Sequence, residues 1–474
     1  MWYFVLPLRK LYLGGLVMTR KEIDSIGQLT LNDTQWYGIH TKRAKDNFNL
    51  AGRDVNLSLI YAIVEIKKAA AQTNGQLGLL DKEKAEAIVH ACDEILEKKW
   101  DAQFTTDALQ GGAGTSTNMN VNEVVANVGL KYLGHELGEY TYLDPFDDVN
   151  HGQSTNDVYP SALRIAAIRW VRMVSDELAR LQQALQQKEA EFEGISKLGR
   201  TQLMDAVPVT LGEEFGAYAQ AIGRDRWRIY KVEERLRMIS LGGTAVGTGV
   251  NAMKRYSFKV VDQLRDNTGI GLARAEFPMD LTQNNDVFVE VSGLLKSCAV
   301  NLMKIANDLR LMNSGPKGGL GEIGLRAWQA GSSIMPGKVN PVIPEMVVQG
   351  AMKVMANDVA ITQAASYGQL ELNAFMPLIA DSLLDSLMIL KKGVNAFTEK
   401  CINSVEANIE QCSAHLQQGA IWETALVPLI GYHEATKIYK EAGSDLQKLE
   451  QILHERTKLS DEQIIQIIQS SNKE

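Results

Sequence analysis

Residues 331–341 of the chain, GSSIMPGKVNP, combine groups that could do acid–base chemistry with the composition of a loop. Two serines, Ser332 and Ser333, precede a Pro-Gly pair, and Lys338 and Asn340 add one cation and one amide. Such a loop could carry a general base and grip a carboxylate. A polar surface turn explains the same composition equally well, so other parts of the chain have to decide.

Three further polar stretches lie far away in the sequence, around Thr115, at residues 154–156 and at Thr201. Each supplies uncharged hydroxyl or amide groups with few competing carboxylates. Hydroxyls and backbone N–H groups at helix N-termini stabilise negative charge, so these stretches together predict a cradle for an anion. The chemistry they suggest is removal of a proton next to a carboxylate, because the charge left behind spreads into that carboxylate as an enediolate.

Removal of such a proton needs a base in the same site. A serine hydroxyl is a weak base, but a nearby cation such as Lys338 and the amide dipoles of the loop favour its ionised form. Either Ser332 or Ser333 could therefore take the proton, and the residues alone do not choose between them.

The composition is ordinary for a globular protein, because 45% of the 474 residues are hydrophobic and 22% are charged. The formal net charge of -8 gives no basic surface for nucleic acid. The seven histidines and four cysteines have no metal-ligand spacing, so we expect no metal site and no cofactor. The cysteines are expected to be buried single thiols in a reducing compartment, the cytoplasm.

The first residues are apolar, but Pro7, Arg9 and Lys10 break the run before it could span a membrane or form a signal core. No small-x-small cleavage site follows. We expect residues 1–17 to form a loose extension, with Met18 as an alternative start, and we expect no membrane contact.

Most of the chain has apolar residues at three- and four-residue spacing, which predicts amphipathic helices. They are expected at 56–80, 81–100, from about 118 onwards, and at 161–193, 213–238, 253–268, 285–311, 343–363 and 376–397. Long helices without strand-like alternation predict an all-α protein with a long central bundle. The expected domains are an N-terminal domain, the central bundle and a small helical C-terminal domain, at 1–153, 154–405 and 406–474.

Five motifs follow one another in an order that resembles the aspartase/fumarase superfamily: LQGGAGTSTNMNVNE, GQSTND, GRTQLMDAVPVTLGEEF, GGTAVGTGVN and GSSIMPGKVNP. The likeness runs nearly end to end and includes all of the polar loops. It implies a three-domain subunit and a homotetramer in which each active site draws its loops from three subunits. Such sharing would explain why the polar motifs are dispersed along this chain.

Three places resemble the aspartase branch more than class II fumarases. Residues 342–345 read VIPE where fumarases typically read TQCE, and residues 36–41 read WYGIHT where fumarases usually have Gln before Thr. Gln202 stands where fumarases carry a histidine. The resemblance therefore implies reversible deamination of L-aspartate to fumarate and ammonia.

The resemblance also implies a role for each loop. Ser332 would be the base that takes the β-proton, on a loop that closes over the bound substrate. Four hydroxyl residues would hold the β-carboxylate as it becomes the enediolate: Thr115, Ser154, Thr155 and Ser333. Two residues would bind the α-carboxylate: Lys338 and Asn340. Three residues would face the departing amine: Asn156, Thr201 and Gln202.

Some positions depart from the family pattern and leave alternatives open. Asp144 replaces a histidine or asparagine, and Gly152 replaces a larger residue, which puts the secondary anion site of fumarases in doubt. Met376 and Val348 replace polar residues common in aspartases, and we expect packing changes there. The alternatives are a fumarate hydratase, a lyase of a related or N-substituted amino acid, and a non-catalytic member such as the lens proteins of the superfamily. The intact GSSIMPGKVNP loop speaks against the last.

Overall fold

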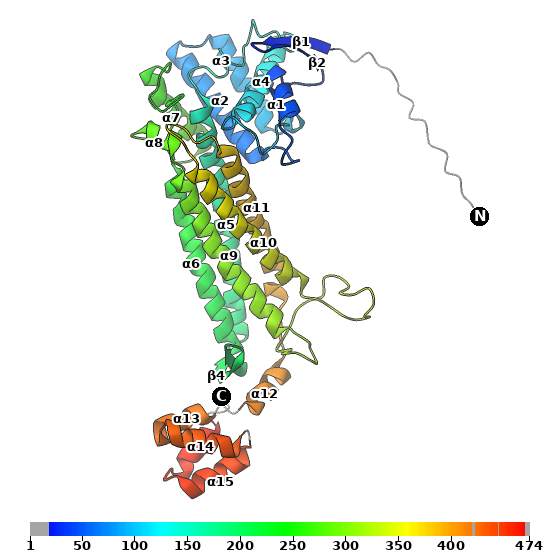
Figure 1. Ribbon diagram of the computed structural model, residues 1–474, viewed down its shortest axis with the longest axis vertical. Coiled ribbons are helices and arrows are strands. Elements are labelled where there is room, and N and C mark those ends of the chain that lie inside the picture. Colours follow the sequence, from blue (N-terminus) through cyan, green and yellow to red (C-terminus); the bar gives the residue numbers. More distant parts are fainter. Residues whose placement is uncertain (1–18, 420–421, 444, 470–474) are drawn as a thin grey trace, which may run out of the picture. The chain divides into compact units, whose positions relative to one another are not determined.

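The computed structural model describes residues 19–419, 422–443 and 445–469 (Figure 1). Within these ranges the protein is built of helices, with four short two-stranded sheets between them. The all-α fold class is confirmed. The loose extension expected at residues 1–17 lies outside the described residues.

Two compact units make up the described chain. The first consists of the described residues up to 166, together with 236–286 and 363–381. The second consists of 167–235, 287–362 and the described residues from 382 onwards. The domain boundaries expected at residues 153 and 405 stay a prediction. No helix in the described ranges is both long enough and apolar enough to cross a membrane.

The first unit packs its helices around α2. Its elements are β1 (Thr19–Asp24), β2 (Gly27–Asn32), α1 (Ile39–Asn47), α2 (Leu57–Leu77), α3 (Lys82–Leu96), α4 (Thr115–Tyr132), β5 (Met238–Ile239), α7 (Lys254–Thr268), β6 (Ala273–Arg274) and α8 (Pro278–Gln283). Strands β1 and β2 pair antiparallel, whereas β5 and β6 pair in parallel. Helix α2 begins where the Asn56 side chain accepts the N–H of Ser58, and it packs against α3, α4 and α7.

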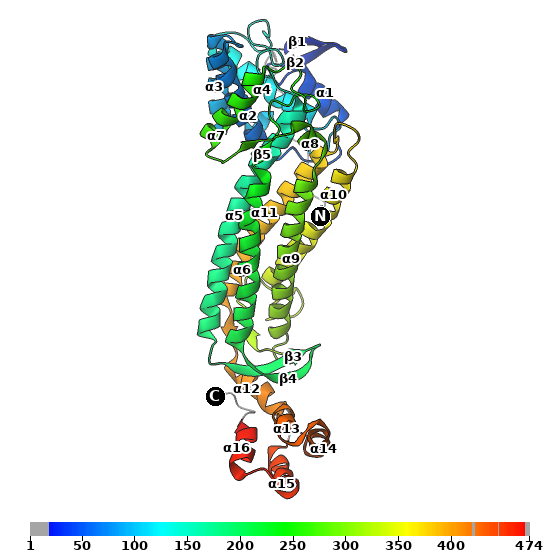
Figure 2. The ribbon, with the colours of Figure 1, turned by 90° about the vertical axis from the view of Figure 1, so that its left-hand side faces the viewer.

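Long helices dominate the second unit, and each of them also contributes one or more residues to the first: α5 (Thr155–Glu191), α6 (Leu211–Leu236), α9 (Asp286–Met312), α10 (Val342–Ser366) and α11 (Met376–Lys400). Figures 1 and 2 show these helices running side by side. Arg172 of α5 pairs with Glu233 of α6 at 2.7 Å, and Asp358 of α10 accepts a hydrogen bond from Ser292 of α9 at 2.8 Å. The expected long bundle is therefore present.

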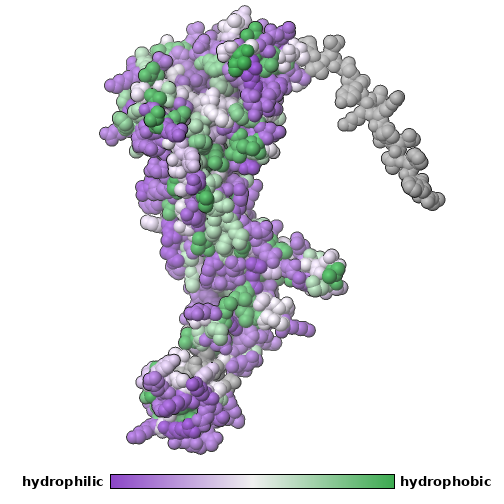
Figure 3. Space-filling view, viewed as in Figure 1, coloured by the Kyte–Doolittle hydropathy of each residue, from purple (hydrophilic) through white to green (hydrophobic). Residues whose placement is uncertain are grey.

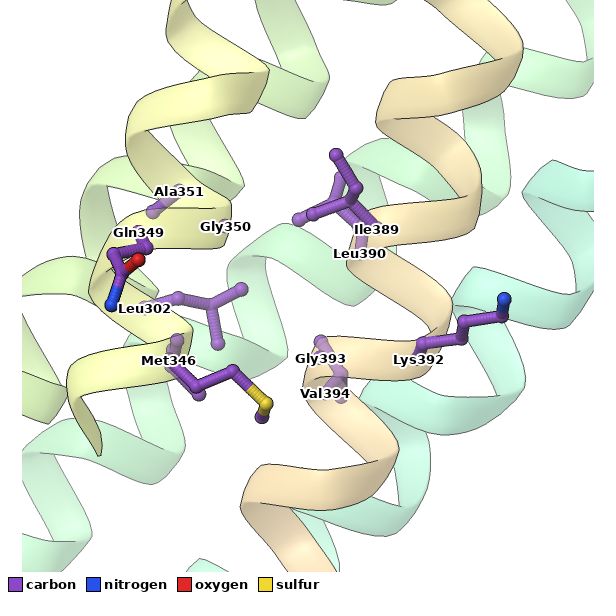
Figure 4. A pocket seen from close by; sticks show the side chains of 11 residues that line it. Leu302, Met346, Gln349, Gly350, Ala351, Ile389, Leu390, Lys392, Gly393 and Val394 are labelled. Carbon is purple, nitrogen blue, oxygen red and sulfur yellow. The ribbon is translucent and has the colours of Figure 1, made fainter. Parts of the chain in front are cut away.

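An apolar groove of about 410 Å³ lies among α9, α10 and α11 (Figure 4). Leu302, Met346 and Ile389 line it. On the same two helices α10 and α11, Val348 and Met376 are buried, which agrees with the packing role expected for both. All four cysteines are likewise buried and free of disulfides, as expected.

The second unit also contains short strands and a group of short helices. These elements are β3 (Ser196–Thr201), β4 (Met204–Thr210), β7 (Ile323–Gly324), β8 (Glu406–Ala407), α12 (Ile409–Gln418), α13 (Trp422–Ile430), α14 (Tyr432–Ala442), α15 (Leu446–Arg456) and α16 (Asp461–Gln469). The β3–β4 hairpin was not expected from the sequence. Helices α13–α16 share a hydrophobic core of their own, which includes Trp422, Leu449 and Ile464.

One buried carboxylate joins several parts of the second unit. Glu322 is excluded from solvent and lies 2.9 Å from the Lys197 ammonium and 2.7 Å from the Arg200 guanidinium, both on β3. Its third partner is Nδ1 of His415 on α12, at 2.9 Å. Burial by itself would raise the pKa of Glu322, but the charge of Lys197 and these hydrogen bonds lower it overall. The carboxylate therefore fixes the base of the hairpin to the segment that leads into residues 331–341.

Replacing Glu322 with glutamine should lower the free energy of unfolding by about 3 kcal/mol, because it leaves buried cations without their counter-charge. Urea unfolding followed by circular dichroism measures this loss. The matched control is Glu234→Gln, which removes the same charge from an exposed pair with Lys231 and should leave the unfolding midpoint unchanged. Equal effects of the two substitutions would contradict the central role of Glu322.

Candidate active site

Helix α4 begins within the glycine-rich motif at Thr115, three residues earlier than expected. The expectation failed because Gly112, Ala113 and Gly114 all adopt left-handed backbone conformations, with φ of 81°, 56° and 93°, and so turn the chain directly into the helix. The Thr115 hydroxyl donates to the Gly112 carbonyl at 2.7 Å. Thr115 is exposed and lies in the first turn, where backbone N–H groups have no partner within the helix.

Helix α5 also begins earlier than expected, at Thr155 instead of residue 161. Pro160 lies inside it, near the N-terminus, where a missing N–H costs little. Ser154 precedes the helix, and its hydroxyl oxygen accepts the N–H of Asn156 at 3.2 Å. The Asp157 carboxylate in turn accepts the N–H of Ser154 at 3.0 Å. The bond from Ser154 to Asp157 is one half of a capping box, and the serine hydroxyl caps the second helical residue instead of the third, so both bonds stabilise the first turn.

The N-termini of α4 and α5 lie close together in the first unit. A Cβ on Gly114 would lie 2.3 Å from the ring of Tyr159, so glycine is what allows α4 to approach the buried tyrosine of α5. Asn118 of α4 also donates to the Asn150 side chain, just before α5, at 3.1 Å. Both helix dipoles present positive ends here, so Thr115 and residues 154–156 form a region that suits an anion.

Asp157 was not singled out in the sequence, although it anchors this region. The side chain is fully buried and accepts the N–H groups of Gly242 and Thr244 at 3.0 and 2.9 Å, in addition to that of Ser154. Burial raises its pKa to about 6, although these hydrogen bonds favour the charged form. Asn156 adds a bond from its amide nitrogen to the Ala245 carbonyl at 2.7 Å. The motif GGTAVGTGVN is therefore held against the start of α5.

Thr201 and Gln202 lie at the tip of the β3–β4 hairpin in the second unit. Thr201 pairs with Met204, so Gln202 and Leu203 alone form the turn. Both have left-handed backbones, with φ of 54° and 66°. A two-residue hairpin turn of this kind normally contains glycine or asparagine, so the turn holds Gln202 in a strained, exposed position.

The loop of residues 331–341 precedes α10 in the chain and extends sideways from the long helices in Figure 1. Two hydrogen bonds join its ends. The Gly331 N–H donates to the Lys338 carbonyl at 2.9 Å, and the Asn340 amide donates to the Gly331 carbonyl at 2.8 Å. The Ser332 hydroxyl oxygen accepts two backbone N–H groups, from Ile334 at 3.2 Å and Met335 at 3.0 Å. Two such donors stabilise negative charge on that oxygen.

The expected site residues fall into two groups. The first unit brings together four of them: Thr115, Ser154, Thr155 and Asn156. The second unit holds the other six, on the hairpin turn and on the closed loop: Thr201, Gln202, Ser332, Ser333, Lys338 and Asn340. In the described part of the chain, no cluster of three or more His, Cys, Asp or Glu side chains could hold a metal ion.

A separate cavity of about 320 Å³ in the first unit lies beside the segment that departs from the family pattern. Three carboxylates line it, those of Asp24, Glu123 and Asp144. Burial raises the pKa of Glu123 to about 7, and the hydrogen bond from Arg43 holds the pKa of Asp24 well below its usual range. Three carboxylates around one cavity disfavour the binding of an anion there. This agrees with the doubt that the sequence raises about the secondary anion site of fumarases in this chain.

Comparison with known proteins covers nearly the whole chain. A family model described as "Lyase" matches residues 27–356, and one described as "Fumarase C C-terminus" matches residues 424–472. An aspartate ammonia-lyase from Helicobacter pylori is 44% identical over 455 residues, which is 96% of this chain and 97% of the relative. One from Bacillus subtilis is 43% identical over 452 residues, 95% of each chain.

Solved structures with the same fold include two lyases. A fumarate lyase:delta crystallin from Brucella melitensis bound to cobalt has a TM-score of 0.90 and 44% sequence identity, and the match covers 96% of this chain and 99% of that one. A recombinant class II fumarase from Schistosoma mansoni has a TM-score of 0.91 and 32% identity, and the match covers 96% and 98% of the two chains.

The contact between Gly114 and Tyr159 can be tested by a pair of substitutions. Gly134→Ala introduces a side chain at a similar φ of 84° with no atom within 4 Å, and it should cost about 1–2 kcal/mol of unfolding free energy from backbone strain. Gly114→Ala should cost about 1–3 kcal/mol more, because the methyl group meets the tyrosine ring. Denaturant unfolding measures both values, and equal losses would rule out the proposed packing.

Proposed function

The chain belongs to the aspartase/fumarase family of lyases, and on that premise we propose that it catalyses the reversible elimination of ammonia from L-aspartate to give fumarate. The observation that carries this proposal is the environment of the Ser332 oxygen. Two backbone N–H groups point at it, so the loop lowers the cost of an ionised serine, which is the form that can take the β-proton.

The anion region at the N-termini of α4 and α5 suits the β-carboxylate. Removal of the proton places a second negative charge on this group, and donors that are already in place stabilise it without reorganisation. We assign this contact to four hydroxyl residues: Thr115, Ser154, Thr155 and Ser333. The positive ends of two helices support the same charge.

The remaining residues fit the two other groups of aspartate. The exposed ammonium of Lys338 suits the α-carboxylate, with Asn340 beside it in the closed loop. The Asn156 amide nitrogen is already bonded to Ala245, so its carbonyl oxygen remains as an acceptor for the substrate's ammonium group. Thr201 and Gln202 complete the contact with the departing amine in this proposal.

Two features favour deamination over the hydratase alternative. Gln202 occupies a position at which fumarases carry a histidine, whereas some aspartases carry glutamine and others histidine. A glutamine amide does not ionise near neutral pH, so it cannot act as a general acid or base. Relatives named aspartate ammonia-lyase share 43–44% of their residues with this chain, against 32% for the class II fumarase structure. Formation of malate from fumarate without ammonia is the outcome that would favour a hydratase.

We further propose a homotetramer in the cytoplasm, with sites shared between subunits. Apolar residues are exposed on the bundle (Figure 3), including Met346 at 42%, Met352 at 55% and Val359 at 60% on α10. At the hairpin tip, Leu203 is 72% and Met204 70% exposed. Apolar surface of this extent on elements that carry site residues is typical of a subunit interface.

Purified protein incubated with L-aspartate should release ammonia and fumarate in equal amounts. Ser332→Ala should lower kcat by about 10²–10⁴-fold, the usual contribution of a general base, while the far-UV circular dichroism spectrum stays unchanged. Absorbance of fumarate and an enzymatic ammonia assay give the two products independently. Absence of both products in the unaltered protein would refute the assignment to aspartate.

Shared sites can be tested by mixing two inactive variants. Ser332→Ala and Asn156→Ala alter residues in different units, so a site built from different subunits can receive one intact copy of each. After dissociation and reassembly of an equimolar mixture, about a quarter of the wild-type activity should return by random assortment. Each variant treated alone serves as the control. No recovery in verified mixed oligomers would mean that each site is built within one subunit.

A further inference from the structure

Lys67 on α2 is a lysine without solvent exposure, directly behind the turn that leads into α5. Its ammonium nitrogen lies 2.8 Å from Asn150 Oδ1 and 2.9 Å from Gln153 Oε1, so it donates to two neutral amide oxygens. Burial lowers the pKa of Lys67 to about 7, and the negative charge of Asp157 opposes that shift. Burying a cation costs folding free energy unless a negative charge lies close to it.

Asp157 is a buried acid whose negative charge acts on Lys67. The two side chains hold adjacent residues of one turn, because Lys67 donates to Gln153 and Asp157 accepts the N–H of Ser154. This carboxylate is required to hold Ser154 and the segment from Gly242 to Thr244 in place. It also lies three residues from Ser154, where the substrate's carboxylate is proposed to bind. In a buried environment such a negative charge would repel the substrate strongly, so the loop needs a compensating cation that does not itself occupy the site.

The side-chain oxygen of Asn150 links Lys67 to the turn before α5. Besides the Lys67 ammonium, the amides of Asn118 and Asn122 on α4 donate to the same oxygen, at 3.1 and 3.2 Å. The Asn150 amide nitrogen then donates to the Gln153 carbonyl at 3.2 Å, one residue before Ser154. Side chains of α2 and α4 therefore both form hydrogen bonds to the turn that precedes residues 154–156, which are proposed to bind the carboxylate.

We propose that Lys67 is a positioning residue of the reaction, whose ammonium offsets the charge of Asp157 so that residues 154–156 attract the β-carboxylate of the substrate. This inference rests on the proposed function and extends it to a residue that does not touch the substrate. It requires the charge of Lys67, and not only its hydrogen bonds to the turn.

Two substitutions separate the charge from the hydrogen bonds. Lys67→Met removes both. Asn150→Asp keeps the shape and the contact with Lys67, and its carboxylate cancels the positive charge of the ammonium. It also removes the amide donor to the Gln153 carbonyl, so a thermal unfolding midpoint no lower than that of the wild type is required as evidence that the turn is still held. The matched control is Lys68→Met, the same change at the next residue, where the lysine forms a surface pair with Asp93 at 2.5 Å. For each protein we would measure KM for L-aspartate, the inhibition constant for succinate, and the thermal unfolding midpoint.

Both Lys67→Met and Asn150→Asp should raise KM and the succinate inhibition constant at least tenfold in folded protein, whereas Lys68→Met should change them less than twofold. A normal inhibition constant in Asn150→Asp would reduce Lys67 to a structural tie and overturn the inference, even if Lys67→Met fails to fold. Normal constants in folded Lys67→Met would overturn it as well. Inactive wild-type protein would instead refute the proposed function, because the inference is tested only after turnover of aspartate is established.

Discussion

The buried carboxylate of Asp157 is the constraint on which the first group of site residues depends. Backbone N–H groups from two distant segments converge on it, so the start of α5 and the motif around Gly242 can take up their positions only together. A folded chain normally avoids an unpaired buried charge. Here three backbone N–H donors and the ammonium of Lys67 offset that cost, so one network holds the start of α5 and the residues proposed to bind the substrate's carboxylate.

The second unit follows a similar plan around Glu322. Lys197 and Arg200 approach this carboxylate from the hairpin, and His415 approaches it from α12. In both units a buried acid organises backbone segments, while the groups proposed to contact the substrate are neutral or cationic. The carboxylates of Asp157 and Glu322 are thus buried, and hydrogen-bond donors lie on the proposed substrate side of the loops. Binding of a dicarboxylate requires such donors.

The long helices could be predicted because apolar spacing is local information: α9 was expected at 285–311 and runs from 286 to 312. The polar loops were equally visible in the sequence. The β3–β4 hairpin was not predicted because its turn, Gln202-Leu203, lacks the glycine or asparagine that normally marks a two-residue hairpin turn. The early start of α4 was not predicted because it depends on three consecutive left-handed residues, 112–114, which include an alanine. Lys67 escaped notice because a lysine on an amphipathic helix normally faces solvent.

At the tip of the β3–β4 hairpin, the backbone conformation of Gln202 does not depend on the chemistry of its side chain. Its left-handed geometry is imposed by the pairing of Thr201 with Met204 and by the ion pair that holds Arg200, next to the tip, against Glu322, and not by the preference of Gln202 itself. A different side chain at this position would therefore be displayed in the same place at little structural cost. The side chain presented at this tip can therefore change while the rest of the scaffold stays as it is.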